Sequence, residues 1–389
     1  MIISRITTHI LRTSIAERTF YSSQAKFPDR NSLVVKIEAD NGLVGWGEGG
    51  QYGPPNPVAS CINDVLAPLI VNGPADQPVR IWEQLYAFSR DFGRQSAYIE
   101  AISAIDIALW DLWGKALRQP IHALLGGAFR DRVTAYATGG YYGADYHDHS
   151  HALRELERET AAYAAAFSIL KMKVGLLSVK ADAERVAAVR RADGDNIKLL
   201  ADANHAYNAT TAIRMGRELE KHGVLWLEEP VIPEDRAGYR KVRDALSIPI
   251  AGGECEYTRY GFRDLFVGEC VDIAQPDLCV CGGFSEWLKI QALASSFGVM
   301  TIPHVWGSGV ALAAALHAIA AIPPSPHTAN PIALQNEPVI EFDRTYNPLR
   351  DDLLSDKFVL KHGALPVPQG PGLGVNVNED MLAKYSAKR

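Results

Sequence analysis

Three short apolar stretches that each end in an acid decide the fold: LLAD (199–202), LWLEE (225–229) and PIAGGE (249–254). The acids Asp202, Glu228 and Glu254 follow one another at intervals of 26 residues, close to the roughly 30 residues of one strand–helix–strand unit. Successive parallel strands of a barrel present their carboxyl ends at one mouth, where barrel enzymes have their active sites. The spacing therefore predicts three carboxylates that converge at the mouth of an α/β barrel.

The same alternation of strand-like and helix-like segments extends to both sides of these stretches. Beyond residue 127, short apolar or β-branched runs alternate with helical segments rich in alanine and arginine, which is typical of parallel βαβ units. Eight runs are predicted to be strands: 133–137, 169–174, 198–201, 224–227, 248–251, 271–274, 299–302 and 339–342. Eight strands are enough to close a barrel.

The first 127 residues have a different pattern. SLVVKIEADNGLVGWGE (32–48) places two alternating apolar runs around an Asp-Asn-Gly turn, a strong hairpin signal. Residues 1–13 also alternate and predict a strand rather than a signal peptide, and residues 98–117 have helical spacing. We expect a small α+β unit over residues 1–127, a barrel over 128–345, and a tail over 346–389 that packs back on the first unit.

Composition excludes several classes of protein. The formal net charge of the 389 residues is -6, so the chain offers no basic surface and is not expected to bind nucleic acid. The longest apolar run, 310–322, is too short to cross a bilayer and predicts a buried helix. The five cysteines show no CxxC spacing, which indicates neither a disulfide framework nor a zinc cluster and fits a reducing cytoplasm.

The three acids predict a metal ion. Anions brought together repel one another unless a cation lies between them, and an all-oxygen set suits Mg²⁺ better than zinc. Each acid alone could instead cap the helix that follows its strand. Three acids at the same position in successive strand–helix units favour a metal site over three separate helix caps.

Two further pairs of residues predict acid–base chemistry. Lys171 and Lys173 share one face of a strand, which points both ammonium groups into the barrel, and neighbouring cations are expected to lower a lysine pKa toward that of a general base. Asp277 and His304 end two adjacent strands, so the carboxylate can orient the imidazole. The alternatives are lysines that only form salt bridges with the acids, and a purely structural histidine.

Three other features belong near the mouth. Glu341, on the eighth strand, is predicted to donate a hydrogen bond to a substrate carboxylate, or else is a plain strand-end acid. Asn204 and Trp306 follow mouth residues and are candidates for substrate contact. Gly307-Ser308-Gly309 opens a helix whose free N–H groups could receive a carboxylate, an ordinary tight loop being the alternative.

These residues resemble the enolase superfamily, specifically its mandelate racemase group, and the match extends from NGLVGWGE (41–48) to PGLG (371–374). The resemblance implies a modified TIM barrel, (β/α)7β, with an N-terminal α+β capping domain. It implies Mg²⁺ on Asp202, Glu228 and Glu254. It also implies Lys173 as a base with Lys171 beside it, opposite the His304–Asp277 dyad. The sixth strand lacks the lysine that the muconate cycloisomerase and dipeptide epimerase branches carry, since none occurs between residues 271 and 283.

Within this group the segments GECEYTRYG (253–261), QPDLCVCGGFSE (275–286), IPHVWGSGV (302–310) and EFDRTYNPLR (341–350) look most like galactarolactone cycloisomerases. That similarity implies abstraction of the proton α to the carboxylate of an acid sugar or its lactone, an enediolate, and ring opening to a 3-deoxy-2-keto-hexarate. An acid-sugar dehydratase is the alternative, then a racemase or epimerase, and outside enzymes a sugar-acid-binding barrel. Similar enzymes are often homo-oligomers.

Overall fold

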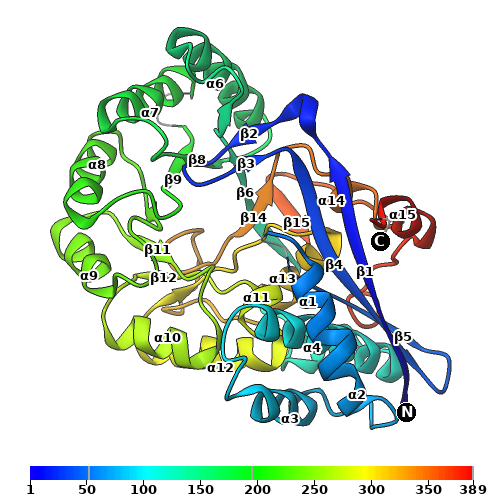
Figure 1. Ribbon diagram of the computed structural model, residues 1–389. Helices are drawn as coiled ribbons and strands as arrows, with labels where there is room; N and C mark the ends of the chain where they lie inside the picture. Colours follow the sequence, from blue (N-terminus) through cyan, green and yellow to red (C-terminus); the bar gives the residue numbers. More distant parts are fainter. Residues whose placement is uncertain (51–52, 194–195, 388–389) are drawn as a thin grey trace.

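The computed structural model describes residues 1–50, 53–193 and 196–387 (Figure 1). Its N-terminal unit is an antiparallel sheet in the order β1-β4-β5, formed by β1 (Ile3–Ser14), β4 (Asp29–Ala39) and β5 (Val44–Gly49). The predicted hairpin around residues 40–42 is confirmed. Its helical segments are α1 (Asn56–Ser60), η2 (Cys61–Leu66), α2 (Ala67–Ile70), α3 (Pro78–Ser89), α4 (Ala97–Leu117) and α5 (Ile121–Leu124). The helix predicted over 98–117 is α4.

Alternate glycines on β5 explain how closely α4 packs against the sheet. A Cβ atom added at Gly45 would lie 2.1 Å from the carbonyl oxygen of Ala108, and one at Gly47 would lie 2.0 Å from that of Ala104. Both distances are far below van der Waals contact, so a side chain at either position would push the helix off the strand. The glycines that separate apolar residues in residues 42–49 are therefore a packing requirement.

The C-terminal unit is the predicted barrel. Its eight parallel strands are β6 (Arg132–Gly139), β8 (Ile169–Lys173), β9 (Lys198–Asp202), β10 (Leu227–Glu228), β11 (Ile250–Gly252), β12 (Ile273–Ala274), β13 (Met300–Thr301) and β14 (Ile340–Asp343). They follow the order β14-β6-β8-β9-β10-β11-β12-β13. Every predicted strand is present, and the (β/α)7β barrel with its capping domain is confirmed.

Helices surround the strands on the outside of the barrel (Figure 1). They are α6 (His149–Ala164), α7 (Val179–Asp193), α8 (Ala209–Lys221), α9 (Arg236–Ala245), α10 (Thr258–Val267), α11 (Leu278–Cys281), α12 (Gly283–Ser296) and α13 (Gly309–Ala320). The apolar run predicted to be a buried helix forms α13, whose residues are all buried. Among the described residues, no helix combines the length and the hydropathy that a membrane span requires.

The interior of the barrel has an apolar layer below a polar one. Buried apolar side chains from the eight strands or from residues next to them pack together there: Tyr136, Ile169, Leu200, Trp226, Ala251, Ile273, Ile302 and Val339. In a strand, the residue two places further along lies on the same face. Lys171, Asp202 and Glu228 stand two places after Ile169, Leu200 and Trp226. The period of two therefore places the polar side chains directly above the apolar layer, at the mouth.

A second small sheet lies beside the mouth. It runs in the order β3-β2-β7 and joins β2 (Phe20–Tyr21) and β3 (Lys26–Phe27), from the N-terminal unit, to β7 (Tyr142–Gly143), which follows β6. The one-turn helix η1 (Ala16–Arg18) precedes it. This sheet holds residues 20–27 against the barrel.

The C-terminal tail contacts both units. Its elements are α14 (Pro348–Asp351), β15 (Ala364–Pro366) and α15 (Glu379–Tyr385). β15 pairs with β6 of the barrel, and α15 lies beside β1 (Figure 1), where the Ala387 N–H donates to the Ile10 carbonyl oxygen at 2.8 Å. The predicted boundaries at residues 127 and 345 stay predictions.

Candidate active site

The three predicted acids converge at the barrel mouth. Asp202 and Glu228 end β9 and β10, Glu254 follows β11, and all three are buried. Each offers an oxygen, and these oxygens lie within 4.8 Å of one another. Glu228 Oε2 is buried without a hydrogen-bond partner among the described residues. Burial and the charge of Asp202 raise the pKa of Glu228 to about 8, as expected for acids crowded together in a buried site. This donor set fits a divalent cation with oxygen ligands.

Both lysines point into the same cluster. Lys171 Nζ lies 2.7 Å from Glu228 Oε1 and 3.0 Å from Glu341 Oε1, and Lys173 Nζ donates to Asp202. The predicted lowering of the Lys173 pKa, which counted a metal ion among the neighbouring charges, stays a prediction. Among the protein's own groups, burial lowers that pKa, but the carboxylates of Asp202, Glu254 and Glu228 together outweigh burial and raise it.

The predicted dyad is present across the mouth. His304 Nδ1 lies 2.8 Å from Asp277 Oδ2, and His304 Nε2 lies 3.5 Å from Glu254 Oε2. Asp277 Oδ1 accepts the Cys279 N–H at 2.8 Å, which fixes the carboxylate. Burial lowers the pKa of His304, but the carboxylates of Glu254 and Asp277 outweigh it and raise that pKa to about 9. The His304 imidazole therefore holds a proton more strongly than an ordinary histidine does.

Glu341 of β14 lies in the same buried cluster. It accepts hydrogen bonds from Thr138 Oγ1 at 2.5 Å and from the Val305 N–H at 3.3 Å, and it pairs with Lys171. Burial raises its pKa, but the charges of Lys171, His304 and Lys173 together outweigh burial and lower that pKa to about 2. Glu341 accepts hydrogen bonds in this arrangement, and its predicted role as a donor to the substrate stays a prediction.

A cavity of about 300 Å³ opens over this cluster. Lys173 and His304 both line it, from strands on different sides of the barrel. The candidate contact residues Asn204 and Trp306 line it as well. The cavity wall comprises Ser22, Gln24, Ala25, Phe27, Asp29, Arg30, Asn31, Gly53, Tyr141, Lys173, Asn204, His205, Glu254, Cys255, His304 and Trp306. Segments from the capping domain thus close the mouth of the barrel.

Arg30 is a cavity residue that the sequence does not reveal. It is buried, pairs with Asp343 at 2.7 Å, and places its guanidinium 4.1 Å from the centre of the Trp306 ring. Its Nη1 is buried without a hydrogen-bond partner among the described residues. Arg30 belongs to β4 of the capping domain, so only the docking of that domain brings it to the barrel.

A carboxylate of the capping domain accepts hydrogen bonds from the start of helix α13. Glu48 of β5 accepts from the Ser308 N–H at 2.8 Å, from Ser308 Oγ at 2.6 Å and from the Ala311 N–H at 2.9 Å. The suggestion that this loop receives a substrate carboxylate does not hold for the Ser308 and Ala311 N–H groups, because Glu48 of the capping domain already accepts their hydrogen bonds. The loop instead locks α13 to β5.

Comparisons with known proteins agree with this architecture. Residues 5–126 match the family model "Mandelate racemase / muconate lactonizing enzyme, N-terminal domain", and residues 154–381 match "Enolase C-terminal domain-like". The chain is 42% identical over 99% of both chains to D-galactarolactone cycloisomerase of Agrobacterium fabrum. It is 36% identical, over 92% of this chain and 91% of the relative, to arabinonate dehydratase of Saccharolobus solfataricus.

Solved structures of the same superfamily resemble the whole chain. The 3,6-anhydro-D-galactonate cycloisomerase of Zobellia galactanivorans superimposes with a TM-score of 0.88 at 39% identity, covering 100% of both chains. A racemase from Streptomyces coelicolor A3(2) with bound magnesium has a TM-score of 0.86 at 27% identity, over 99% of this chain and 100% of that one. The chain belongs to the mandelate racemase/muconate lactonizing enzyme family of the enolase superfamily.

Proposed function

We propose that this protein is a Mg²⁺-dependent cycloisomerase that removes the proton α to the carboxylate of an acid-sugar lactone and opens the lactone by β-elimination. One observation carries the proposal: Lys173 and His304 line one cavity from different sides of the barrel, His304 is paired with Asp277, and three converging acids, one of which also lines the cavity, lie in the same cluster. Removal of a weakly acidic C–H proton requires this combination of a base, a second proton carrier and stabilised negative charge.

Asp202, Glu228 and Glu254 would hold the metal ion. When bound, Mg²⁺ would supply positive charge that stabilises the developing negative charge on the substrate carboxylate. Lys171 is placed beside that carboxylate's site by its contacts with Glu228 and Glu341 and would donate a hydrogen bond to one oxygen. Lys173 or His304 takes the α proton, and the ring oxygen leaves the β-carbon as a carboxylate. Ketonisation of the resulting enol then adds a proton to the β-carbon, which the other residue can deliver.

The capping domain would contribute to recognition. Arg30 has one buried nitrogen without a partner and lines the cavity next to Trp306. A guanidinium is suited to bind a carboxylate or a hydroxyl-rich sugar chain. We therefore place the far end of the acid sugar against Arg30, Trp306 and Asn204. The 42% identical relative named D-galactarolactone cycloisomerase supports a hexaric acid lactone as the substrate.

Dehydration of an open-chain acid sugar is the second candidate. The relative at 36% identity is named arabinonate dehydratase. The two reactions share proton abstraction and differ only in the leaving group, which is a ring oxygen in one case and a hydroxyl in the other. The same barrel residues can serve both.

Proton NMR in D₂O separates these functions. The Mg²⁺-loaded protein is incubated with galactarolactone, with galactarate and with arabinonate, and the products are identified. We expect a 3-deoxy-2-keto-hexarate from the lactone and little turnover of the open-chain acids. Turnover of the open-chain acids alone would support the dehydratase, and α-proton exchange without elimination would support a racemase.

Lys173→Ala tests the assigned base. We expect loss of at least roughly 10²-fold in rate, which is the usual contribution of a general base, with the product unchanged. Lys357→Ala, which removes an exposed lysine paired with Asp352, is the matched control and should keep full activity. A Lys173→Ala variant with wild-type activity would refute the proposal.

A further inference from the structure

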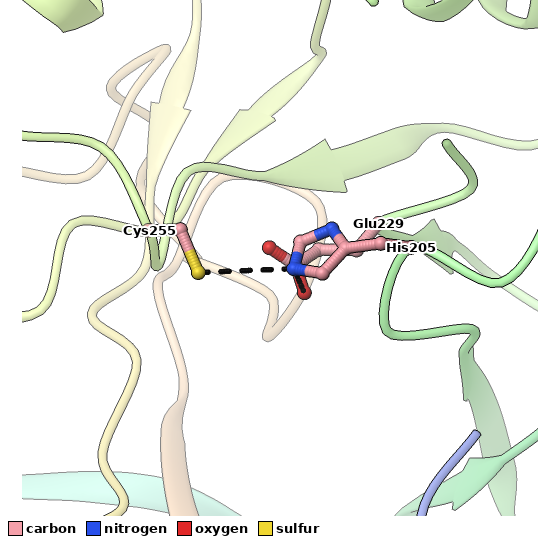
Figure 2. Close-up of side chains that lie close together, drawn as sticks. All are labelled: His205, Glu229 and Cys255. Atoms are coloured by element: carbon pink, nitrogen blue, oxygen red, sulfur yellow. Dashed lines mark hydrogen bonds and ion pairs between the residues drawn. The ribbon is translucent and has the colours of Figure 1, made fainter. Parts of the chain in front are cut away.

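A second group of potential metal ligands lies beside the three acids. His205, Glu229 and Cys255 follow Asp202, Glu228 and Glu254 by three, one and one residues, so they come from the same three strand ends. Each offers one ligand atom, and these atoms lie within 4.8 Å of one another. Figure 2 shows the Cys255 thiol and the His205 imidazole pointing toward one another, with the Glu229 carboxylate beside the ring.

The distances match the edges of a zinc tetrahedron. Cys255 Sγ lies 3.7 Å from His205 Nε2, and His205 Nε2 lies 3.1 Å from Glu229 Oε2 (Figure 2). Zn–S and Zn–N bonds of about 2.3 and 2.0 Å at tetrahedral angles place sulfur and nitrogen about 3.5 Å apart, and nitrogen and oxygen about 3.3 Å apart. One ion can therefore contact all three atoms with small side-chain adjustments.

Burial and charge also favour a cation here. Glu229 is 1% exposed, and its side chain contacts His205 and the Asn204 amide, the latter at 3.4 Å. Within the described residues, no lysine or arginine lies at ion-pair distance from Glu229. A buried carboxylate is stable only with a positive or hydrogen-bonding partner. A metal ion would supply the missing charge.

The backbone is bent so that these side chains meet. Asn204, His205 and Glu229 have φ values of +40°, +64° and +45°. Residues other than glycine adopt this left-handed region at an energetic cost, and such residues gather at functional sites. His205 and Cys255 also line the 300 Å³ cavity, so a fourth coordination position would open toward a bound molecule.

We propose that His205, Glu229 and Cys255 form a second metal site, suited to Zn²⁺, which opens into the same cavity as the three-acid site. Its chemistry separates it from the first site. A nitrogen, oxygen and sulfur set selects zinc, whereas three carboxylates select Mg²⁺. Three protein ligands with one open position are the arrangement of zinc sites that bind a water or substrate oxygen. The site does not depend on which acid sugar the protein converts.

Cobalt is the spectroscopic probe. The protein is first saturated with excess Mg²⁺ to fill the three-acid site, and Co²⁺ is then titrated in under reducing conditions. We expect one Co²⁺ per chain, a near-ultraviolet band from charge transfer between thiolate and cobalt, and visible bands of a tetrahedral ion. Zn²⁺ should displace the cobalt and abolish these bands.

Variants identify the ligands. Cys255→Ser should remove the charge-transfer band, and Glu229→Gln, which keeps the thiol, should weaken Co²⁺ binding at least tenfold. Cys61→Ser, which alters a half-buried thiol of η2 in the capping domain, should leave the bands unchanged. The proposal is overturned if the wild-type protein shows no thiolate band, or if the band survives in folded Cys255→Ser. The first result would leave His205 and Glu229 as a simple hydrogen-bonded pair.

Discussion

Asp277 uses its two carboxylate oxygens for two different tasks. Oδ1 accepts the Cys279 N–H and begins helix α11, while Oδ2 lies against His304 Nδ1. The cap fixes the carboxylate, and the carboxylate fixes the imidazole. A substitution at Asp277 can therefore separate its contribution to stability, through the helix cap, from its contribution to catalysis, through His304.

Asp277→Asn should keep the cap and lose the dyad. Asparagine caps helices about as well as aspartate, so the free energy of unfolding should change by no more than about 1 kcal/mol. The neutral amide no longer supports the imidazolium, so the pKa of His304 should fall from about 9 and activity should drop about 10²-fold or more. Steady-state kinetics across pH and urea unfolding measure both effects.

Asp277→Ala is the comparison variant. Its activity should fall as much as that of Asp277→Asn. It should also be about 1 kcal/mol less stable than Asp277→Asn, because alanine cannot cap the helix. If Asp277→Asn kept wild-type kinetics, His304 would not depend on this carboxylate.

Helix α13 shows how a buried histidine can join several segments. His317 Nε2–H donates to the Leu373 carbonyl oxygen at 3.0 Å, and Nδ1 accepts the His122 N–H at 3.2 Å. Only the neutral imidazole can make both bonds. Burial lowers the pKa of His317 to about 3, against a small opposing effect of the Leu373 carbonyl. The histidine links α13 to α5 and to the C-terminal tail.

His317→Gln should change how stability depends on pH. The native state resists protonation of His317, whereas the unfolded chain takes up a proton near pH 6.5, so this residue's contribution is present above pH 6.5 and is lost as pH falls toward 3. At pH 7 the variant should be about 1–3 kcal/mol less stable. Below pH 6.5, the difference in unfolding free energy between the wild-type protein and the variant should shrink by up to roughly 1.4 kcal/mol per pH unit.

Urea unfolding at pH 7.5, 6 and 5 measures this gap. His147→Gln, an exposed histidine in the loop before α6, is the control and should track the wild-type protein at each pH. A gap of constant size would mean that His317 does not titrate on unfolding.

Three converging acids couple metal binding to the stability of the whole molecule. Asp202, Glu228 and Glu254 lie within reach of one ion only when β9, β10 and β11 are assembled. A ligand that binds only the native state stabilises it by mass action. The assembly of this protein into a homo-oligomer stays a prediction.

Mg²⁺ should therefore raise the melting temperature, by an amount equivalent to about 2.7 kcal/mol when its concentration is 100 times the dissociation constant. Asp202→Asn should abolish most of this increase. Asp131→Asn, an exposed acid, should preserve it. Calorimetry with and without Mg²⁺ measures the effect, and an undiminished shift in Asp202→Asn would exclude the three acids as the site.

The sequence by itself determined the strands, the hairpin and the ring of polar residues at the mouth. These features follow from local rules: side chains alternate along a strand, and one βα unit repeats at nearly constant length. Asp202, Glu228 and Glu254 could be placed together for that reason, and so could Asp277 and His304 on adjacent strands.

Only the tertiary structure decided the charge states and the walls of the cavity. The raised pKa of Lys173 and the lowered pKa of Glu341 depend on which charges meet in the buried cluster. Arg30 reaches the mouth only because the capping domain docks there, and Glu48 from the same domain accepts hydrogen bonds from Ser308 and Ala311. Burial and Coulomb interactions depend on distance in space, and a linear pattern of residues does not contain those distances.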